Sequence, residues 1–451
     1  MRRLLSALAT GALVLTCLTG AAAAAPTAAH APATPPPAAT SGDFDVLTYN
    51  IAGLPAGIGD SDPETNTPLI GQRLGPYAIV NVQEDFNYHA ALYANDRHPH
   101  RTATSGGVVF GDGLNTLSDH PFEDFQRVRW RDCTNADCLT PKGFTLGRVR
   151  LAEGVFVDVY NVHTNADVTD AALAARRANI AQLSEFVRAN SAGNAVIVMG
   201  DTNTRYTRAG DTIRTLVRDN GLADPWVDLI RDGDVPAEGS EALVCDKAAP
   251  TDDCEVVDKV LYRGSALVHL TATSYRNDWR DFLRDDGTHL SDHYPHAVGF
   301  TWSLPDGGLR ASDFFGGPHG AAFNDAPALP TTLAPRTLTL RGGARLDGLA
   351  LTHDDGTVLR HGGTGGAPVS LTLASGEHLT SVTLSRGKKD GRTRVFSASF
   401  GTDQGRTLAA GAPTTDRVTF SAPPGLRIVG FAGRSGDEID KLGVLYAPII
   451  R

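Results

Sequence analysis

Polar residues suited to phosphoester chemistry stand where apolar runs of the chain end. Residues 196–203, "VIVMGDTN", pass from a strand-like run directly to Asp201 and Asn203. In an extended chain, residues i and i+2 point to the same side, so these two side chains could face one spot. A surface turn is the alternative interpretation, because Asp and Asn are both common in turns.

Four further strand-like runs end or begin in the same way. Segments 44–50, 78–84 and 155–163 end in an amide, a carboxylate and an imidazole, and a last strand follows an Asp–His pair. Each ending taken singly has an ordinary explanation as a turn or a surface group. Together they predict one site, because open α/β folds place their sites at strand ends. The predicted set is Asn50, Glu84, His163, Asp201, Asn203, Asp292 and His293.

These residue types suit hydrolysis of a phosphoester with the help of a metal ion. Glu84 is a hard oxygen ligand for Mg²⁺, and the amide oxygen of Asn50 would assist it. His293 would accept a proton from water, while Asp292 or another nearby acid fixes its tautomer. The sequence therefore predicts both a metal ligand and a general base.

The remaining members of the set would handle the water and the phosphate. Asp201 would position the attacking water. Asn203 and His163 would donate hydrogen bonds to phosphoryl oxygens as negative charge builds on them. The predicted reaction is metal-assisted phosphoester hydrolysis.

The elements that must position these residues change character along the chain. Residues 44–302 mix strand-like runs with an amphipathic helix over 170–193, which Gly193 should end. From about Leu309 the chain is rich in Gly, Thr and short alternating runs, which indicates an all-β domain. We expect domains at 42–303 and 308–451, joined by the linker "SLPDGGLRAS".

The first 41 residues are typical of a secreted protein. A basic pair, an apolar core and small residues over 1–25 predict a signal peptide, cleaved after Ala25 or Ala31. A lipoprotein anchor through Cys17 is the alternative. Residues 26–41 form a Pro/Ala-rich linker, and no later stretch has the roughly 20 apolar residues that span a bilayer.

Charge and cysteine usage narrow the function further. The formal charge is −10, and loss of Arg2 and Arg3 with the signal makes it −12, which disfavours broad electrostatic binding to nucleic acid. Four cysteines remain after the signal is removed. Secretion and their spacing favour disulfides, with free thiols or a zinc site as alternatives. The expected pairs are Cys133–Cys138 and Cys245–Cys254.

The motifs "LTYNIAGL", "VQEDF", "NVHTNA", "GDTNTRY", "VDKVLY" and "SDHYPHAVGF" occur in the order of a known superfamily. Over residues 44–302 the chain resembles the endonuclease/exonuclease/phosphatase superfamily, which has a DNase I-like fold. The resemblance implies a four-layer α/β sandwich, a divalent metal such as Mg²⁺, Mn²⁺ or Ca²⁺, and in-line attack by water. It also implies that Asp258, in "VDKVLY", supports the site.

Within that superfamily, "DCTNADCLTPKGFTLGRVRL" and "SDHYP" resemble the secreted bacterial sphingomyelinases. This implies a phosphodiester substrate such as a lipid headgroup, and peripheral membrane contact with no obligate protein partner. Tyr275, Trp279 and Phe282 could present aromatic rings to lipid, or they could pack in the core. An extracellular nuclease is the alternative enzyme.

From about Phe314 to Tyr446 the chain resembles a jacalin-like lectin, a β-prism. The matching pieces include "GGPHGAAFNDA", "HGGTGG" and "IVGFAGRSGDEIDKLGVLY". The resemblance implies weak glycan binding near Gly320, Asp437 and Asp440, although Asp437 and Glu438 stand where stacking aromatics often occur. A prism that serves only as a spacer, or a secreted lectin with a silent enzyme domain, are the alternatives.

Overall fold

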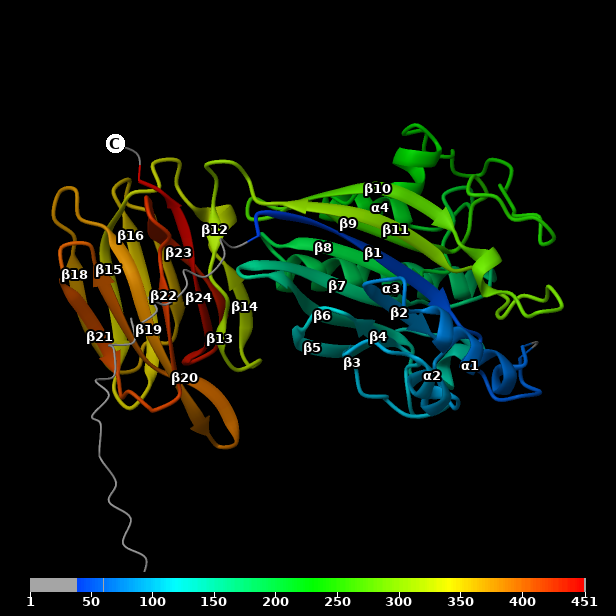
Figure 1. Cartoon of the computed structure of the whole chain (residues 1–451), viewed down its shortest axis with the longest axis horizontal. Helices are drawn as coiled ribbons and strands as arrows, with labels where there is room; N and C mark the ends of the chain where they lie inside the picture. The colour runs from blue at the N-terminus through cyan, green and yellow to red at the C-terminus, as the bar shows by residue number, and fades with distance from the viewer. Residues whose placement is uncertain (1–38, 60, 450–451) are drawn as a thin grey trace, which may run out of the picture. The chain divides into compact units, whose positions relative to one another are not determined.

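The computed structural model describes residues 39–59 and 61–449, which belong to one unit (Figure 1). The predicted signal peptide, the Ala31 cleavage site and nearly all of the 26–41 segment lie outside the described residues. The first part of the unit is built around two sheets. Helices lie against each of them, which confirms the predicted four-layer α/β sandwich.

The first sheet has six strands in the order β10-β11-β1-β2-β4-β3. Strand β1 runs parallel to β2 and antiparallel to β11, so the carboxyl ends of β1 and β2 reach the same edge. The bounds are β1 Ser41–Asn50, β2 Ile79–Gln83, β3 His100–Arg101, β4 Asn115–Ser118, β10 His269–Asn277 and β11 His296–Ser303.

The second sheet has five strands in the order β5-β6-β7-β8-β9. Strand β8 runs parallel to β7 and antiparallel to β9. The first residue of β9 therefore lies opposite the last residue of β8. The bounds are β5 Phe122–Arg129, β6 Gly143–Ala152, β7 Val155–His163, β8 Ala195–Asp201 and β9 Asp258–Arg263.

The alternation of side chains along β1 explains how the layers assemble. Phe44 and Val46 point between the two sheets into the main core, whereas Leu47 and Tyr49 point to the helices outside the first sheet. Those helices are α1 (Pro63–Arg73) and α2 (His89–Asn95). Both faces of the sheet are therefore buried, as expected for an α/β sandwich.

The second sheet is covered by α3 (Asp170–Asn190) and α4 (Ile213–Asn220). The Thr169 hydroxyl caps α3 by accepting from the Ala172 N–H at 3.2 Å. Helix α3 ends three residues before the predicted stop at Gly193, which instead adopts a left-handed φ of +72° in the turn that leads into β8. Short helical turns lie at Asn135–Cys138 (η1), Trp226–Ile230 (η2) and Trp279–Phe282 (η3).

The second part of the unit is all-β, as predicted, and consists of three small sheets that surround a core of their own. Their orders are β12-β24-β23-β14 with β13 on β24, then β17-β16-β15-β18, then β21-β20-β19-β22. The first sheet contains β12 (Arg310–Ala311), β13 (Phe315–Gly316), β14 (Ala321–Asn324), β23 (Leu426–Ser435) and β24 (Ile439–Pro448), with the turn η4 at Ala326–Ala328. The second contains β15 (Pro335–Gly342), β16 (Leu346–His353), β17 (Val358–Gly362) and β18 (Ala367–Thr372). The third contains β19 (Leu379–Lys389), β20 (Arg392–Thr402), β21 (Thr407–Gly411) and β22 (Arg417–Ser421).

The predicted linker is a structured connection. Its residues Arg310 and Ala311 form β12 on β24, and Val429 and Leu445 of the β-prism belong to the same hydrophobic core as the sandwich. Lys441 on β24 donates to Glu123 and Asp124 on β5, at 2.8 and 2.6 Å. The connection therefore packs as part of a continuous core.

None of the helices that the structure describes is both long and apolar enough to cross a bilayer.

Candidate active site

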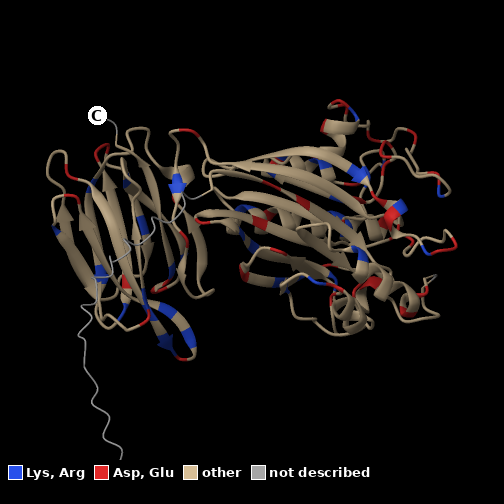
Figure 2. Cartoon of the chain, viewed as in Figure 1, with Lys and Arg blue, Asp and Glu red and all other residues tan. Residues whose placement is uncertain are grey.

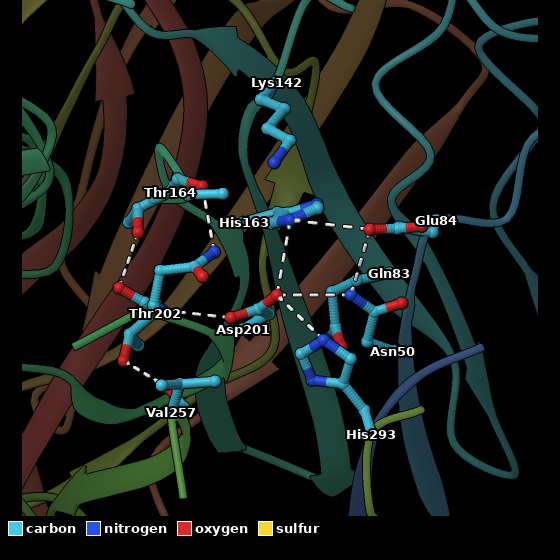
Figure 3. A network of polar contacts seen from close by, with 12 residues as sticks. Asn50, Gln83, Glu84, Lys142, His163, Thr164, Asp201, Thr202, Val257 and His293 are labelled. Carbon is cyan, nitrogen blue, oxygen red and sulfur yellow. Dashed lines mark hydrogen bonds and ion pairs between the residues drawn. The ribbon is translucent and has the colours of Figure 1, made fainter. Parts of the chain in front are cut away.

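The sandwich brings the predicted residues to one edge (Figure 3). In the parallel pair β7–β8, His163 lies opposite Asp201, and in the antiparallel pair β8–β9, Asp201 lies opposite Asp258. Asn50 ends β1 on the facing sheet. A side-chain bond joins the two sheets at this edge, because the Asn50 amide donates to Asp201 at 3.1 Å.

Asp201 is the centre of this network. Its Oδ2 atom lies 3.1 Å from Asn50 Nδ2, 3.3 Å from His163 Nε2 and 3.8 Å from His293 Nε2, while its Oδ1 accepts the Asn203 N–H at 3.0 Å. Burial alone raises the pKa of Asp201, but the His293 charge and the hydrogen bond from His163 outweigh it and hold the pKa well below its usual value. Asp201 is therefore an ionised acceptor inside the site.

The imidazole of His293 is held by Asp258. Nδ1 lies 2.9 Å from Asp258 Oδ2, which leaves Nε2 turned toward Asp201. Burial lowers the pKa of His293, but the two flanking carboxylates reverse this effect and raise the pKa well above the usual value. The acid adjacent in sequence, Asp292, is exposed, so the acid that orients the imidazole is Asp258.

Glu84 reaches the network through an unusual backbone conformation. Strand β2 ends at Gln83, and Glu84 has φ +58°, which is uncommon for a residue with a side chain. A Cβ atom on Gly53 would lie 2.3 Å from the Glu84 carbonyl oxygen, so a glycine is required there. The Glu84 carboxylate accepts from Asn50 Nδ2 at 3.2 Å.

The site has the donor set for a divalent cation. The Glu84 side chain is 18% exposed, so it keeps access to solvent while Asn50 holds it. Magnesium usually takes one or two protein oxygens and completes its shell with water and phosphate. Asp201, Asp258 and His293 also lie close enough together to hold an ion, although the imidazole occupies the space between the two carboxylates. The side-chain oxygen of Asn50 accepts from the Ala52 N–H at 3.0 Å, so the amide nitrogen of Asn50 is the atom that faces Glu84.

Hydrogen bonds between loops fix the other two predicted phosphate contacts. Trp130 Nε1 donates to the His163 carbonyl at 2.6 Å, and Asn203 Nδ2 donates to the Thr164 carbonyl at 3.2 Å. The Thr202 hydroxyl donates to the Val257 carbonyl at 2.7 Å, which ties the end of β8 to the start of β9. The Nδ1 atom of buried His163 has no protein partner, so it is a buried polar group without a hydrogen bond.

Lys142 is a site residue that the sequence analysis did not single out. Its side chain extends toward His163 in Figure 3, and its charge contributes to lowering the pKa of Asp201. Asp137 holds its ammonium group at 2.6 Å. Asp137 lies inside the Cys133–Cys138 loop, so the signal in the sequence was a lysine shortly after a small disulfide loop and directly before a strand.

Both predicted disulfides are confirmed, Cys133–Cys138 and Cys245–Cys254. The second closes part of the loop that precedes β9. A cavity of about 190 Å³ opens there, lined by Val244, Asp258, Asp292 and His293 among others. A substrate group that enters this cavity would meet the imidazole of His293.

The suggestion that aromatic residues of 275–282 face lipid is wrong for two of them. Tyr275 is 7% exposed and Phe282 only 1%, so both pack in the interior. Trp279 is half-buried, and its Nε1 donates to the Pro250 carbonyl at 3.0 Å. The alternation of side chains along β10 directs the ring of Tyr275 inward, and the turn η3 directs the ring of Phe282 inward.

The β-prism brings Gly320 and Asp440 together. A Cβ atom on Gly320, at φ +71°, would lie 2.4 Å from Asp440 Oδ2. Asp440 is fully buried, and its Oδ1 accepts from Arg394 while Oδ2 has no partner. Asp437 is exposed in the same turn.

Glu438 is a second acid in this cluster, and it is held by two basic side chains. Glu438 accepts from Arg345 at 2.6 Å and from Lys389 at 2.8 Å, and these cations lower its pKa to about 2 against the effect of burial. The carboxylates of Glu438 and Asp440 are therefore already paired with basic side chains of the same domain. The basic hairpin β19–β20 that supplies two of them is visible as a group of blue segments in Figure 2.

Comparison with known proteins identifies both parts. Residues 67–298 match the Endonuclease/Exonuclease/phosphatase family 2, and residues 312–445 match the jacalin-like lectin domain. A sphingomyelinase of Mycobacterium bovis is 40% identical over 279 residues, which cover 60% of this chain and 55% of that protein. The chain thus aligns with about half the length of this curated relative.

Two other proteins are similar to separate parts of the chain. Horcolin of Hordeum vulgare is 28% identical over 140 residues, which cover 29% of this chain and 93% of horcolin. The crystal structure of sphingomyelinase C from Streptomyces griseocarneus aligns at 20% identity with a TM-score of 0.40, covering 57% of this chain and 99% of that one.

Proposed function

The chain belongs to the Endonuclease/Exonuclease/phosphatase family 2, and on that premise we propose that residues 42–303 are a secreted, metal-dependent phosphodiesterase of sphingomyelinase type. The observation that carries the proposal is the imidazole of His293, held between Asp258 and Asp201 beside Asn50 and Glu84. An imidazole, an ionised carboxylate and a hard oxygen ligand are the groups that hydrolysis of a phosphodiester by water requires.

The metal would be held by Glu84, with Asn50 beside it, and Mg²⁺ suits this oxygen-rich position. When bound, the cation supplies charge stabilisation for the phosphoryl oxygens. The backbone of Glu84, with φ +58° and its carbonyl against Gly53, fixes where its carboxylate points. Strain of this kind persists where the surrounding structure holds it, often at functional sites.

The chain's own residues would position water and phosphate. At a pH above its raised pKa, the neutral imidazole of His293 accepts the proton of the attacking water through Nε2, because Asp258 occupies Nδ1. Asp201 orients that water from the opposite side, 3.8 Å from the same nitrogen. The phosphoryl oxygens lie against His163, Asn203 and the ammonium of Lys142, which stabilise charge as it develops.

The substrate is proposed from the relative and from charge. The name of the mycobacterial relative specifies sphingomyelin, and a net charge of −10 opposes a polyanion such as DNA more than a zwitterionic lipid headgroup. Both disulfides fit an oxidising, extracellular compartment. An extracellular nuclease is the second candidate.

A substrate panel separates these candidates. Purified protein is assayed side by side on sphingomyelin vesicles, DNA, RNA and small phosphomonoesters, with and without EDTA. We expect EDTA-sensitive hydrolysis of sphingomyelin and weak activity on the others. Rapid DNA cleavage without lipid hydrolysis would establish the nuclease instead, and no hydrolysis of any phosphoester would support a silent enzyme domain.

For residues 308–451 we propose weak glycan binding that holds the enzyme at a surface and so raises its effective concentration there. The supporting observation is the close approach of Gly320 to the unpartnered Oδ2 of Asp440. Asp440→Asn should remove binding on a glycan array and leave hydrolysis of a soluble phosphodiester unchanged. An array on which the parent protein binds nothing would leave the prism as a spacer.

A further inference from the structure

The outer face of one sheet of the β-prism carries two arginines beside a floor of small residues. This sheet contains β15, β16 and β18, which are labelled in Figure 1, and the edge strand β17. The leucines of β15 and β16 point into the core of the prism. Because side chains alternate along a strand, the residues between those leucines point outward. The outward residues on β15, β16 and β17 include Thr339, Arg341, Gly348, Ala350, Thr352 and Arg360.

The strand register sets the separation of the two arginines. Arg360 lies opposite Ala350 on β16, and Ala350 lies opposite Thr339 on β15. Arg341, two residues further along β15, lies opposite Gly348. Because neighbouring strands are about 4.8 Å apart, the two arginines stand on strands roughly 10 Å apart. The strand between them carries only the small residues Gly348 and Ala350 at these positions, so the guanidinium groups can reach over it.

A cavity of about 130 Å³ lies on this face, and we call it the arginine groove. The Thr339 hydroxyl at its side lies 2.8 Å from the Ser370 hydroxyl. The imidazole of His361 is already engaged, because its Nε2 lies 2.8 Å from Asp325 Oδ1 and its ring stacks on Phe323. The groove therefore offers a ligand two guanidinium groups and several hydroxyls. Its lining includes Thr339, Arg341, Ala350, Thr352, Arg360 and His361.

The two arginines of the groove differ from other basic residues of the prism, because no carboxylate holds them in the part of the chain that the structure describes. Arg345, for example, pairs with Glu438 at 2.6 Å. Arg360 is exposed and forms no ion pair, and Arg341 donates to the Gly366 carbonyl at 3.1 Å. A guanidinium group presents a rigid fork of donors that matches an oxyanion such as a carboxylate. These two forks are therefore open to an anionic ligand.

The charge of the prism is opposite in sign to that of the rest of the chain. Residues 308–451 contain 16 Lys and Arg against 12 Asp and Glu, which gives a formal charge of +4. The whole chain carries −10, so residues 1–307 carry −14. None of the described residues that line the arginine groove is acidic. A positive module on an otherwise negative chain indicates an anionic ligand for that module.

We propose that the arginine groove is a ligand site for an acidic polysaccharide, which it binds through carboxylate or sulfate groups. The guanidinium groups of Arg341 and Arg360 take the acidic groups, and the hydroxyls of Thr339 and Thr352 bind neighbouring sugar hydroxyls. The site is separate from the glycan position near Asp440.

Nucleic acid is a poorer fit to the same groove. Single strands are held largely by stacking of bases on aromatic side chains. None of the described lining residues is Phe, Tyr or Trp, and the imidazole of His361 already stacks on Phe323. The charge of −14 on the rest of the chain also opposes a polyanion as dense as DNA.

Titration with defined polysaccharides tests the proposal. The purified full chain is titrated with hyaluronan, which carries carboxylates, with dextran sulfate, and with uncharged dextran, and Kd is measured by calorimetry. We expect binding to at least one acidic polymer, no binding to dextran, and weaker binding as salt is added. R341Q/R360Q should raise Kd at least about tenfold, because hydrogen bonds to charged groups are among the stronger ones. Arg360→Gln, at an exposed position, should lose part of the affinity and carries the test if the double variant unfolds.

Matched variants distinguish the groove from general charge attraction. R392Q/R417Q removes the same charge from exposed positions of β20 and β22 and should bind like the parent. Asp440→Asn should also keep its affinity for the acidic polymer, which separates this site from the other glycan position. All of these variants should hydrolyse a soluble phosphodiester at the parent rate. An equal loss in R341Q/R360Q and R392Q/R417Q would overturn the assignment of the site. Binding of the parent to neither acidic polymer, or only to DNA or phosphatidylserine vesicles, would overturn the ligand class.

Discussion

Asp258 and His293 lie 35 residues apart in the sequence, and their side chains meet at 2.9 Å. Asp258 begins β9, opposite Asp201 on β8, and the loop before β11 brings His293 to the same edge. A buried acid therefore fixes the imidazole nitrogen that faces away from Asp201. The exposed Asp292, next to His293 in the chain, makes no such contact.

This relationship predicts unequal effects of two matched substitutions. Asp258→Asn should lower kcat on a soluble phosphodiester by about a hundredfold or more, because the imidazole loses the partner that fixes its tautomer. Asp292→Asn should lower kcat on the same substrate by a smaller factor. Circular dichroism and the melting temperature serve as folding controls. An Asp292→Asn effect that exceeds that of Asp258→Asn would contradict the assigned orientation.

Lys142 should matter for phosphate binding. Lys142→Met removes an ammonium group near His163 and should lower kcat/KM by about tenfold or more, since charge-assisted hydrogen bonds are among the strong ones. Lys142→Arg should recover part of the loss. The exposed Arg131→Met, on the same loop, is the matched control. If Lys142→Met and Arg131→Met lower kcat/KM by equal, small factors, Lys142 does not contact the substrate.

Buried His98 predicts a pH-dependent contribution to stability. Its nitrogens lie 2.6 Å from Asp96 Oδ1 and 2.6 Å from the Tyr77 carbonyl. Burial lowers the pKa of His98, but these two acceptors outweigh it and raise the pKa above the ordinary value. The raised pKa means that the stabilisation is fully present below about pH 6.5, the usual value for histidine, and is lost as pH rises through the folded-state value.

Urea unfolding across that range measures the effect. The parent should lose more unfolding free energy between pH 6 and pH 9 than His98→Gln does, because the variant has no imidazolium to lose. Parallel pH profiles for the two proteins would show that folding does not raise the pKa of His98, which would contradict the prediction.

The contact between sandwich and prism predicts a large stability effect. Lys441 is 4% exposed and donates to Glu123 and Asp124. Lys441→Met removes the cation that hydrogen-bonds both carboxylates, while Arg148 and Arg434 stay about 4 Å from Asp124, and it should cost about 3 kcal/mol of unfolding free energy. Lys388→Met, at an exposed position of the β19–β20 hairpin, should change it by less than about 0.5 kcal/mol. Equal effects would show that the contact is not formed in solution.

The strand ends could be recognised from the sequence, but the direction of each side chain at those ends could not. Strict alternation would place Glu84 on the face of Val80 and Val82, yet those valines pack against the helices outside the first sheet. The left-handed backbone of Glu84 sends its carboxylate toward Asn50 instead. Such a conformation depends on tertiary contacts, here the close approach of Gly53, and no local pattern announces it.

Long-range pairing explains the other differences. The acid that holds His293 depends on the register of β8 with β9, and the role of Lys142 depends on a loop folded back by a disulfide. The pairing of Arg394 with Asp440 joins strands that are far apart in sequence. Resemblance located Asp258 and Asp440, whereas their partners required the three-dimensional structure.

The central claim is that His293 is the base of a metal-dependent phosphodiesterase. The most direct test is the release of phosphocholine from sphingomyelin vesicles by the parent protein and by His293→Ala, each with Mg²⁺ and with EDTA. We predict Mg²⁺-dependent release by the parent and a loss of at least about a hundredfold in the correctly folded variant. Full activity of His293→Ala, or release by the parent that EDTA leaves unchanged, would contradict the account.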